Sequence, residues 1–177
     1  MRRILSSLLR YAYIPLLSFA AILQVTIMPD FQIGDGRADL VLTLVLSWTL
    51  LAGNGEGVSW ALVAGLAQDL LTGVPLGVSA LALAIVAFAI GQLIRPLERA
   101  GLLLSPLIVA IGTAGYHLTL IGLYVITQQS VSIVYSLLHA TLPGMALNAL
   151  ITVPIIFVLA RLRRALTPRR VSTLITN

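Results

Sequence analysis

Residues 53–94 read GNGEGVSWALVAGLAQDLLTGVPLGVSALALAIVAFAIGQLI, and this stretch decides the fold class. It holds two apolar runs, 57–71 and 77–94, separated by a break that contains glycine and proline. Runs of this length approach the ~20 residues that a helix needs to cross a hydrocarbon core of about 30 Å. Only helices and closed barrels satisfy every backbone polar group in such a core. Both runs are uniformly apolar, whereas barrel strands would alternate, so they predict transmembrane helices.

The rest of the chain has the same character. Of its 177 residues, 59% are hydrophobic and 10% are charged, against about 25% charged residues in a typical soluble domain. We therefore predict one all-α domain, an integral membrane bundle of six transmembrane helices. The expected spans are residues 11–28, 39–51, 57–71, 77–94, 102–127 and 144–162, followed by a polar tail, 163–177, that is expected to be mobile.

The region between the fifth and sixth spans is open to more than one interpretation. Pro143 and Gly144 predict a break in the last apolar stretch, because proline cannot continue a helix and glycine weakens one. The segment before them, 131–142, then forms a short amphipathic or broken helix. The pattern is compatible with a segment that crosses the membrane, re-enters it or lies flat on it.

The positive charges predict the orientation. Cytoplasmic flanks of membrane helices collect arginine and lysine, and the eleven cations of this chain are all arginines. With a cytoplasmic N-terminus and an even number of spans, ten of the eleven arginines lie in the cytoplasm and only Arg37 lies outside. We therefore predict that both termini are cytoplasmic. Because the arginines flank apolar spans, we predict no nucleic-acid partner.

Two acids stand at positions where they could bind backbone groups. Asp39 precedes the second span, where a carboxylate accepts hydrogen bonds from the first free N–H groups of a helix. Asp69 lies inside an apolar run, at a cost of at least ~2.5–3.5 kcal/mol on insertion scales. It is close to the end of its helix, so we expect its carboxylate to bind the following turn. Contact with a partner protein and proton or ion coupling are the alternatives.

The sequence offers no reaction centre. His117 and His139 each stand alone, without the spacing of a metal site, and there is no cysteine. The nucleophile, phosphate-binding, dinucleotide-binding and zinc-protease motifs GxSxG, P-loop, GxGxxG and HExxH are missing. An intramembrane enzyme would need at least two convergent reactive groups. We therefore predict no catalytic residue, no metal and no cofactor.

Small residues recur at helical spacing. Gly57, Ala61 and Gly65 precede Asp69 at intervals of four residues. Because lipid provides no hydrophobic force between helices, membrane helices associate through close backbone approach, for which small residues are typical. Later spans carry similar stripes, namely Ala80, Ala84, Ala87 and Gly91, then Gly112, Gly115, Thr119 and Gly122, then Gly144, Asn148 and Thr152. These stripes predict tight internal packing, and a docking face for another membrane helix is the alternative.

The stretch 53–81 resembles the signature of the MreD family, the bacterial rod shape-determining membrane proteins. The resemblance lies in Gly65-Leu66, Asp69-Leu70-Leu71, Thr72-Gly73, Leu76-Gly77 and Ala80-Leu81. Upstream, Arg37-Ala38-Asp39-Leu40 resembles the Arg-Pro-Asp/Asn of the family, with Ala38 in place of proline. Ala61-Leu62 stands where the family commonly has Gly-Phe, which keeps a small residue at position 61.

This resemblance implies a non-enzymatic scaffold of the cell-elongation (rod) complex in the bacterial cytoplasmic membrane, which supports lateral peptidoglycan synthesis. The implied partners are the bitopic protein MreC, the polymerase RodA with a class B penicillin-binding transpeptidase, MreB indirectly, and membrane lipid. The implied fold is similar to the substrate-binding subunits of energy-coupling-factor transporters. Candidate residues for partner contact or packing are Asp39, Gly57, Ala61, Gly65, Asp69, Gly73, Pro75 and Gly77.

A second function remains open at this point. A small-solute (vitamin-like) binding subunit of a membrane transporter would line a cavity in its outer half with polar side chains. The candidates for that lining are Gln68, Asp69, Tyr116, His117 and Asn148. The sequence leaves open which spans contact a partner, the oligomeric state, and whether a lipid or small ligand is bound.

Overall fold

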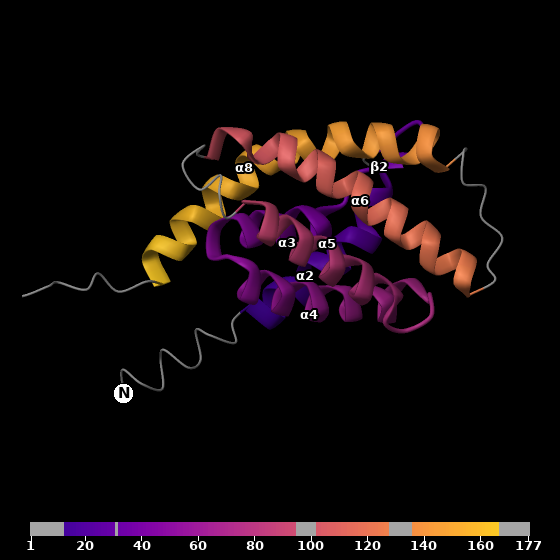
Figure 1. Cartoon of the computed structure of the whole chain (residues 1–177), viewed down its shortest axis with the longest axis horizontal. Helices are drawn as coiled ribbons and strands as arrows, with labels where there is room; N and C mark the ends of the chain where they lie inside the picture. Colours follow the sequence, from indigo (N-terminus) through magenta and orange to yellow (C-terminus); the bar gives the residue numbers. More distant parts are fainter. Residues whose placement is uncertain (1–12, 31, 95–101, 128–135, 167–177) are drawn as a thin grey trace, which may run out of the picture.

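The computed structural model describes residues 13–30, 32–94, 102–127 and 136–166 (Figure 1). The predicted start of the first span, the loop at 95–101, the segment 128–135 and the tail from residue 167 onward lie outside these ranges. The described α-helices are α2 (Tyr13–Thr26), α3 (Leu40–Ala52), α4 (Asn54–Thr72), α5 (Val78–Ile94), α6 (Ser105–Ile126) and α8 (Leu142–Leu166). The shorter elements are the 3₁₀-helices η1 (Met28–Asp30) and η3 (Leu102–Leu104), the π-helix η4 (Ser136–Thr141), and the strands β1 (Gln32–Ile33) and β2 (Gly36–Arg37).

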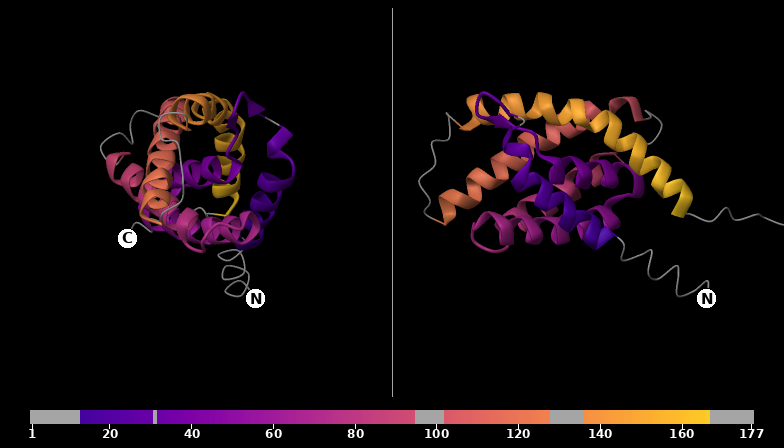
Figure 2. Two further views of the ribbon diagram at one scale, coloured as in Figure 1. Left: turned by 90° about the vertical axis from the view of Figure 1, so that its right-hand side faces the viewer. Right: turned by 180° about the vertical axis from the view of Figure 1, so that it is seen from behind.

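Helix α3 lies at the centre of the bundle. It contacts α2, α4, α5, α6 and α8, and Figure 2 shows the other helices arranged around it. Eight of its 13 residues are buried. Thirteen helical residues rise only about 20 Å, less than a typical hydrocarbon core. The short helix predicted as the second span is therefore enclosed mostly by other helices.

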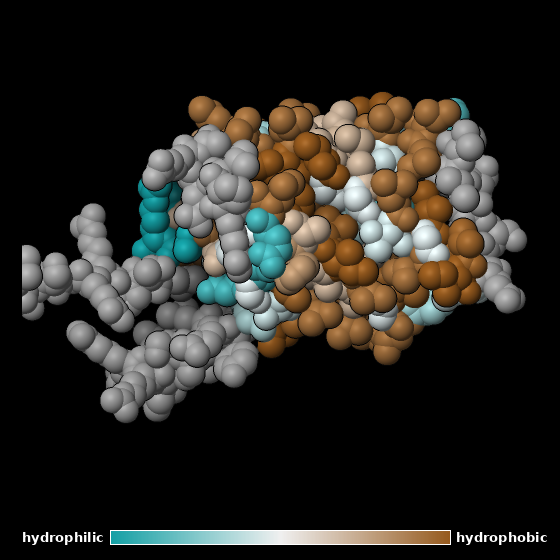
Figure 3. Space-filling view, in the orientation of Figure 1, coloured by the Kyte–Doolittle hydropathy of each residue, from teal (hydrophilic) through white to brown (hydrophobic). Residues whose placement is uncertain are grey.

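The outer surface of the bundle is apolar. In Figure 3 hydrophobic residues cover most of the face in view, and hydrophilic residues gather at one end. Large apolar side chains stand exposed on α2 (Phe19), α5 (Phe88), α6 (Leu107) and α8 (Phe157). Residues Ser105–Ile126 and Leu137–Arg164 form two helices that are long and apolar enough to cross a membrane, while α2, α3 and α5 are apolar but shorter. These features are those of a membrane protein.

The expected break at Pro143 and Gly144 is not seen. Instead η4 leads directly into α8, and Pro143 occupies the first turn of α8. Proline is tolerated there because its missing N–H would have no partner within the helix. Pro154 lies inside α8, which bends along its length (Figure 1), as expected where proline removes a helical hydrogen bond. Helix α8 extends to Leu166 and so includes Arg163 and Arg164, which the sequence analysis assigned to the tail.

A small hairpin lies between the predicted first and second spans. Strands β1 and β2 are antiparallel, with Gln32 opposite Arg37 and Ile33 opposite Gly36. Gly34 turns the chain with φ 61°, a conformation that favours glycine. Gly36 packs on the start of α8, where an added Cβ would lie 2.8 Å from the backbone nitrogen of Gly144. The hairpin is thus fixed against α8.

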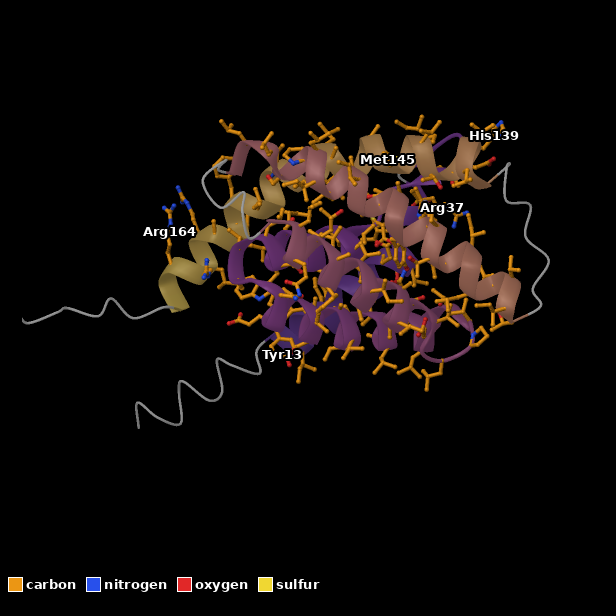
Figure 4. All side chains as sticks on the ribbon, in the orientation of Figure 1. Tyr13, Arg37, His139, Met145 and Arg164 are labelled. Carbon is orange, nitrogen blue, oxygen red and sulfur yellow. The ribbon has the colours of Figure 1, made fainter. Side chains whose placement is uncertain are left out.

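Different segments of the chain lie at the two ends of the molecule. Figure 4 places Tyr13 and Arg164 at one end and Arg37 and His139 at the other. We call the second of these the hairpin end, because β1 and β2 lie there. The start of α2 and the last turns of α8 therefore lie at the same end of the bundle.

Candidate functional site

Asp69 closes the connection between α4 and α5. Its carboxylate is 2% exposed and accepts two backbone hydrogen bonds, from Gly77 N–H to Oδ2 at 2.7 Å and from Ser79 N–H to Oδ1 at 3.0 Å. Gly73 ends α4 with φ 69° and Gly77 follows with φ 97°, both in the left-handed region that glycine adopts freely. The exposed Pro75 lies between them. This is the turn-binding role that the sequence analysis expected of an acid near a helix end.

The small residues that precede Asp69 pack inside the bundle. Gly57, Ala61 and Gly65 are all buried. A Cβ built at Gly65 would fall on the backbone of Ala80 in α5, and it would also lie 2.9 Å from the carbonyl carbon of Ser79. A Cβ at Gly57 would overlap the side chain of Thr49 in α3. This face of α4 therefore packs against α3 and α5.

Asp39 caps α3 and connects it to α8. Its Oδ1 accepts the N–H of Leu42 at 2.8 Å, and the Thr43 hydroxyl donates to its carbonyl at 2.7 Å. Its own N–H donates to Oδ1 of Asn148 at 2.7 Å. Asp39 is 8% exposed and Asn148 is fully buried. The start of α3 is therefore held by its own cap and by a side chain that is distant in sequence.

Asn148 and Gln24 extend this arrangement to neighbouring helices. The Asn148 amide donates to the hydroxyl of Thr113 in α6 at 3.1 Å. Gln24, near the end of α2, accepts from the N–H of Leu40 at 2.6 Å and donates to the carbonyl of Ala38 at 3.1 Å. Amide side chains from two helices thus bind the backbone of Asp39 and of the residues on either side of it.

Tyr116 is buried and interacts electrostatically with both carboxylates. It is 2% exposed, its side chain is hydrogen-bonded to Ser79, and its hydroxyl is within electrostatic range of Asp39 and Asp69. The buried polar groups near the hairpin end form two hydrogen-bonded sets, one around Asp39 and one around Asp69, which together we call the polar layer. Its members are Gln24, Asp39, Asp69, Ser79, Thr113, Tyr116 and Asn148. Each described α-helix contributes to it, counting Asp39 as the cap of α3.

The polar layer is chemically suited to join helices. In a medium of low dielectric constant, a satisfied hydrogen-bond network rigidifies a core, and an unpaired polar group there is costly. The hydrogen bonds of Asp69 and Asn148 go to protein groups. His117 lies near the polar layer and pairs its Nδ1 with the Thr141 hydroxyl at 2.9 Å, whereas His139 is exposed. Among the described residues, no group of three or more histidines, cysteines and acids could hold a metal ion.

The transporter interpretation named five side chains as candidates for the lining of a cavity. Asp69, Tyr116 and Asn148 do come together in the polar layer, where they bind backbone and side-chain groups of the bundle. Gln68 has a buried Oε1 without a hydrogen-bond partner in the part of the chain that the structure describes. The polar candidates are thus used mainly for internal packing.

Aromatic rings mark the opposite end of the bundle. Trp48 and Trp60 stack with ring centroids 4.3 Å apart, and Tyr13 stacks on Trp60 at 5.6 Å. The Trp48 indole N–H donates to the Glu56 carboxylate at 3.1 Å. The sequence analysis missed this stack. The only sign of the stack in the sequence is that each tryptophan lies close to residues 53–56, which separate the predicted spans 39–51 and 57–71.

Gln24 and Thr113 were missed as members of the site. Both stand in apolar spans as ordinary polar residues, and their partners are distant in sequence. A single sequence contains no signal for such pairs. Asn148 was noted only as part of a small-residue stripe and as a possible cavity residue, although it connects three helices.

The chain matches a known protein family. The family model described as rod shape-determining protein MreD matches residues 3–166. No curated protein and no solved structure matches the chain. The similarity to substrate-binding subunits of energy-coupling-factor transporters therefore stays a prediction, as does the count of six spans.

Proposed function

This chain belongs to the MreD family of rod shape-determining membrane proteins, and on that premise we propose that it is a non-enzymatic scaffold of the rod complex that binds MreC. Membership of the family implies a role in determining rod shape. We propose further that this role is exerted in the bacterial cytoplasmic membrane and supports lateral peptidoglycan synthesis. RodA and the class B transpeptidase would join the same assembly, and MreB would act on it indirectly.

The observation that carries this proposal is the internal use of the polar side chains. Asp39, Asp69 and Asn148 bind groups of their own chain, and they give the bundle a fixed core. Among the described residues, the apolar outer faces of the helices and the short hairpin are exposed and free to contact other proteins. A protein with these surfaces is suited to hold other membrane proteins in place.

The hairpin is our candidate for the contact with MreC outside the membrane. Ile33 is 60% exposed on β1, and its neighbours Gln32 and Arg37 are exposed as well. The hairpin has a defined position because Gly36 packs against α8. A bitopic partner crosses the membrane once, so it can contact a lipid-facing helix and this hairpin at the same time.

We also propose six spans with both termini in the cytoplasm. Tyr13 and Arg164 lie at the same end of the bundle, and Arg37 lies at the opposite end (Figure 4). This arrangement supports the orientation that the arginine distribution favours, because the exposed arginines at the end of α8 then face the cytoplasm.

Co-purification from native membranes tests the scaffold. We expect MreC to be recovered with the tagged chain in about equal amounts, and Ile33→Asp to reduce the recovery several-fold, since a charge would replace an apolar contact. The control is Gln32→Asn, a conservative change at the adjacent exposed position. Absence of MreC from a folded, membrane-inserted preparation would contradict the proposal, and equal recovery for both variants would exclude the hairpin as the contact.

A further inference from the structure

The last turns of α8 extend beyond the bundle. Leu159 and Ala160 are buried, at 2% and 9% exposure. The next four residues, 161–164, are all exposed. Successive helical residues are rotated by about 100°, so four consecutive exposed positions leave no side of the helix covered. Arg163 lies one turn after Leu159 and Ala160, on the helix face that these two residues turn toward the bundle. Arg163 is nevertheless exposed.

This helix end combines apolar and cationic groups in a defined order. Phe157 and Val158 are exposed one turn earlier, at 61% and 65%. Arg161, Arg163 and Arg164 then place three positive charges within four residues. Figure 3 shows hydrophilic residues over the last turns of α8, next to the apolar surface of the bundle. The boundary between oily and charged surface therefore lies at this turn.

The acidic residues that the structure describes do not neutralise the three arginines of α8. Asp30 and Asp35 lie in η1 and the hairpin turn, and Asp39 and Asp69 are buried in the polar layer, so these four are at the other end of the bundle. Glu56 accepts the indole N–H of Trp48. Within the ranges that the structure describes, the three arginines therefore have no carboxylate partner.

We propose that Arg161, Arg163 and Arg164 bind the phosphate groups of anionic phospholipids at the membrane surface. Apolar side chains of α8 lie in the acyl region, and the long arginine side chains reach from the same helix to the headgroups. Arginine suits this ligand, because its planar guanidinium binds two phosphate oxygens at once. The inference depends on the membrane location of the chain and is independent of MreC binding.

Native mass spectrometry of the full-length chain tests this site. The chain is released from mixed micelles of phosphatidylglycerol and phosphatidylcholine in equal amounts, and the ratio of the two bound lipids is measured. We expect the triple variant Arg161→Gln, Arg163→Gln, Arg164→Gln to lower the preference for phosphatidylglycerol at least about fivefold. The triple lysine variant keeps the charge but not the bidentate geometry, so we expect a smaller loss. Orientation cannot affect the result, since a micelle exposes both ends of the protein.

The control is Arg37→Gln, which removes an exposed arginine at the hairpin end. We expect it to leave the lipid ratio unchanged. An unchanged ratio in the triple glutamine variant, or an equal loss in Arg37→Gln, would overturn the proposal. The proposal would also be overturned if the triple glutamine variant kept the lipid ratio but recovered less of an acidic protein partner. The arginines would then bind a polypeptide. If the triple variant does not fold, the single variants Arg161→Gln and Arg164→Gln give the same comparison.

Discussion

At the residue scale, Asp69 illustrates how a carboxylate is accommodated in an apolar bundle. A charge inside a membrane protein is tolerated where specific partners replace water. Both oxygens of Asp69 accept backbone N–H groups, at 2.7 and 3.0 Å, from the chain that leads into α5. The carboxylate of Asp69 thus holds the backbone that connects α4 with α5.

Replacement of Asp69 by leucine should destabilise the protein. The buried N–H group of Ser79 and the part-buried N–H group of Gly77 would lose their acceptor, at a cost of about 1–3 kcal/mol for the first and less for the second. We expect a lower midpoint of thermal unfolding in detergent and weaker recovery of MreC. The controls are His117→Gln, which alters a single side-chain pair, and His139→Gln at an exposed position. Equal stability and equal recovery for all three variants would refute the role of Asp69.

At the element scale, glycines with similar sequence context have different surroundings. Gly65 touches the backbone of α5, and Gly112 touches Leu46 in α3. Gly122, at the other end of the α6 stripe, is exposed and has nothing within 4 Å of an added Cβ. The stripe on α4 is therefore internal, and the stripe on α6 is internal only in its first part.

This contrast predicts different tolerance to a large side chain. Gly65→Leu should prevent normal assembly of α4 and α5, because the neighbour at that point is backbone and cannot move aside. Gly122→Leu should leave the fold unchanged. Size-exclusion profiles and thermal midpoints in detergent measure both variants. A monodisperse, thermally normal Gly65→Leu protein would show that the helices can separate without loss of the fold.

The local features of the fold could be predicted from the sequence. The capping carboxylate of Asp39 and the turn-binding carboxylate of Asp69 bind groups within ten residues, so the helix-end pattern is sufficient. The polar layer as a whole could not be predicted. Gln24 reaches Ala38 and Leu40, and Asn148 reaches Asp39, 109 residues away, which only the packed bundle determines.

The hairpin and the continuous start of α8 differ from the predictions, because the sequence patterns there were too short or were ambiguous. The hairpin has strands of two residues, too short for an alternating pattern to be recognised. Pro143 was interpreted as a helix breaker, but at the first turn of α8 proline is favourable. The pattern also gave no sign of the π-helix that precedes α8.

At the scale of the whole molecule, the two ends of the bundle are held by different chemistry. The polar layer joins the helices near the hairpin end through hydrogen bonds, and the stacked rings of Tyr13, Trp48 and Trp60 join α2, α3 and α4 at the other. Between these ends the exterior is apolar. A bundle fixed at both ends is a rigid support for membrane partners, provided that it spans the bilayer with the hairpin outside.

That orientation can be tested by site-specific labelling, because the chain has no cysteine of its own. Gln32→Cys introduces one thiol on the exposed hairpin, and Arg164→Cys introduces one on the exposed end of α8. In intact cells we expect a membrane-impermeant maleimide to label position 32 alone. Position 164 should react only after the cells are lysed, because ten arginines favour the cytoplasmic side.

The unmodified chain is the control, since it must remain unlabelled before and after lysis. The two positions lie at opposite ends of the bundle (Figure 4), so they must report opposite sides if the helices cross the membrane. Labelling of both positions in intact cells would mean that the bundle does not separate its ends across the bilayer. Labelling of position 164 alone would invert the orientation, place the arginines outside and leave the hairpin in the cytoplasm, where it could not contact an external domain of MreC.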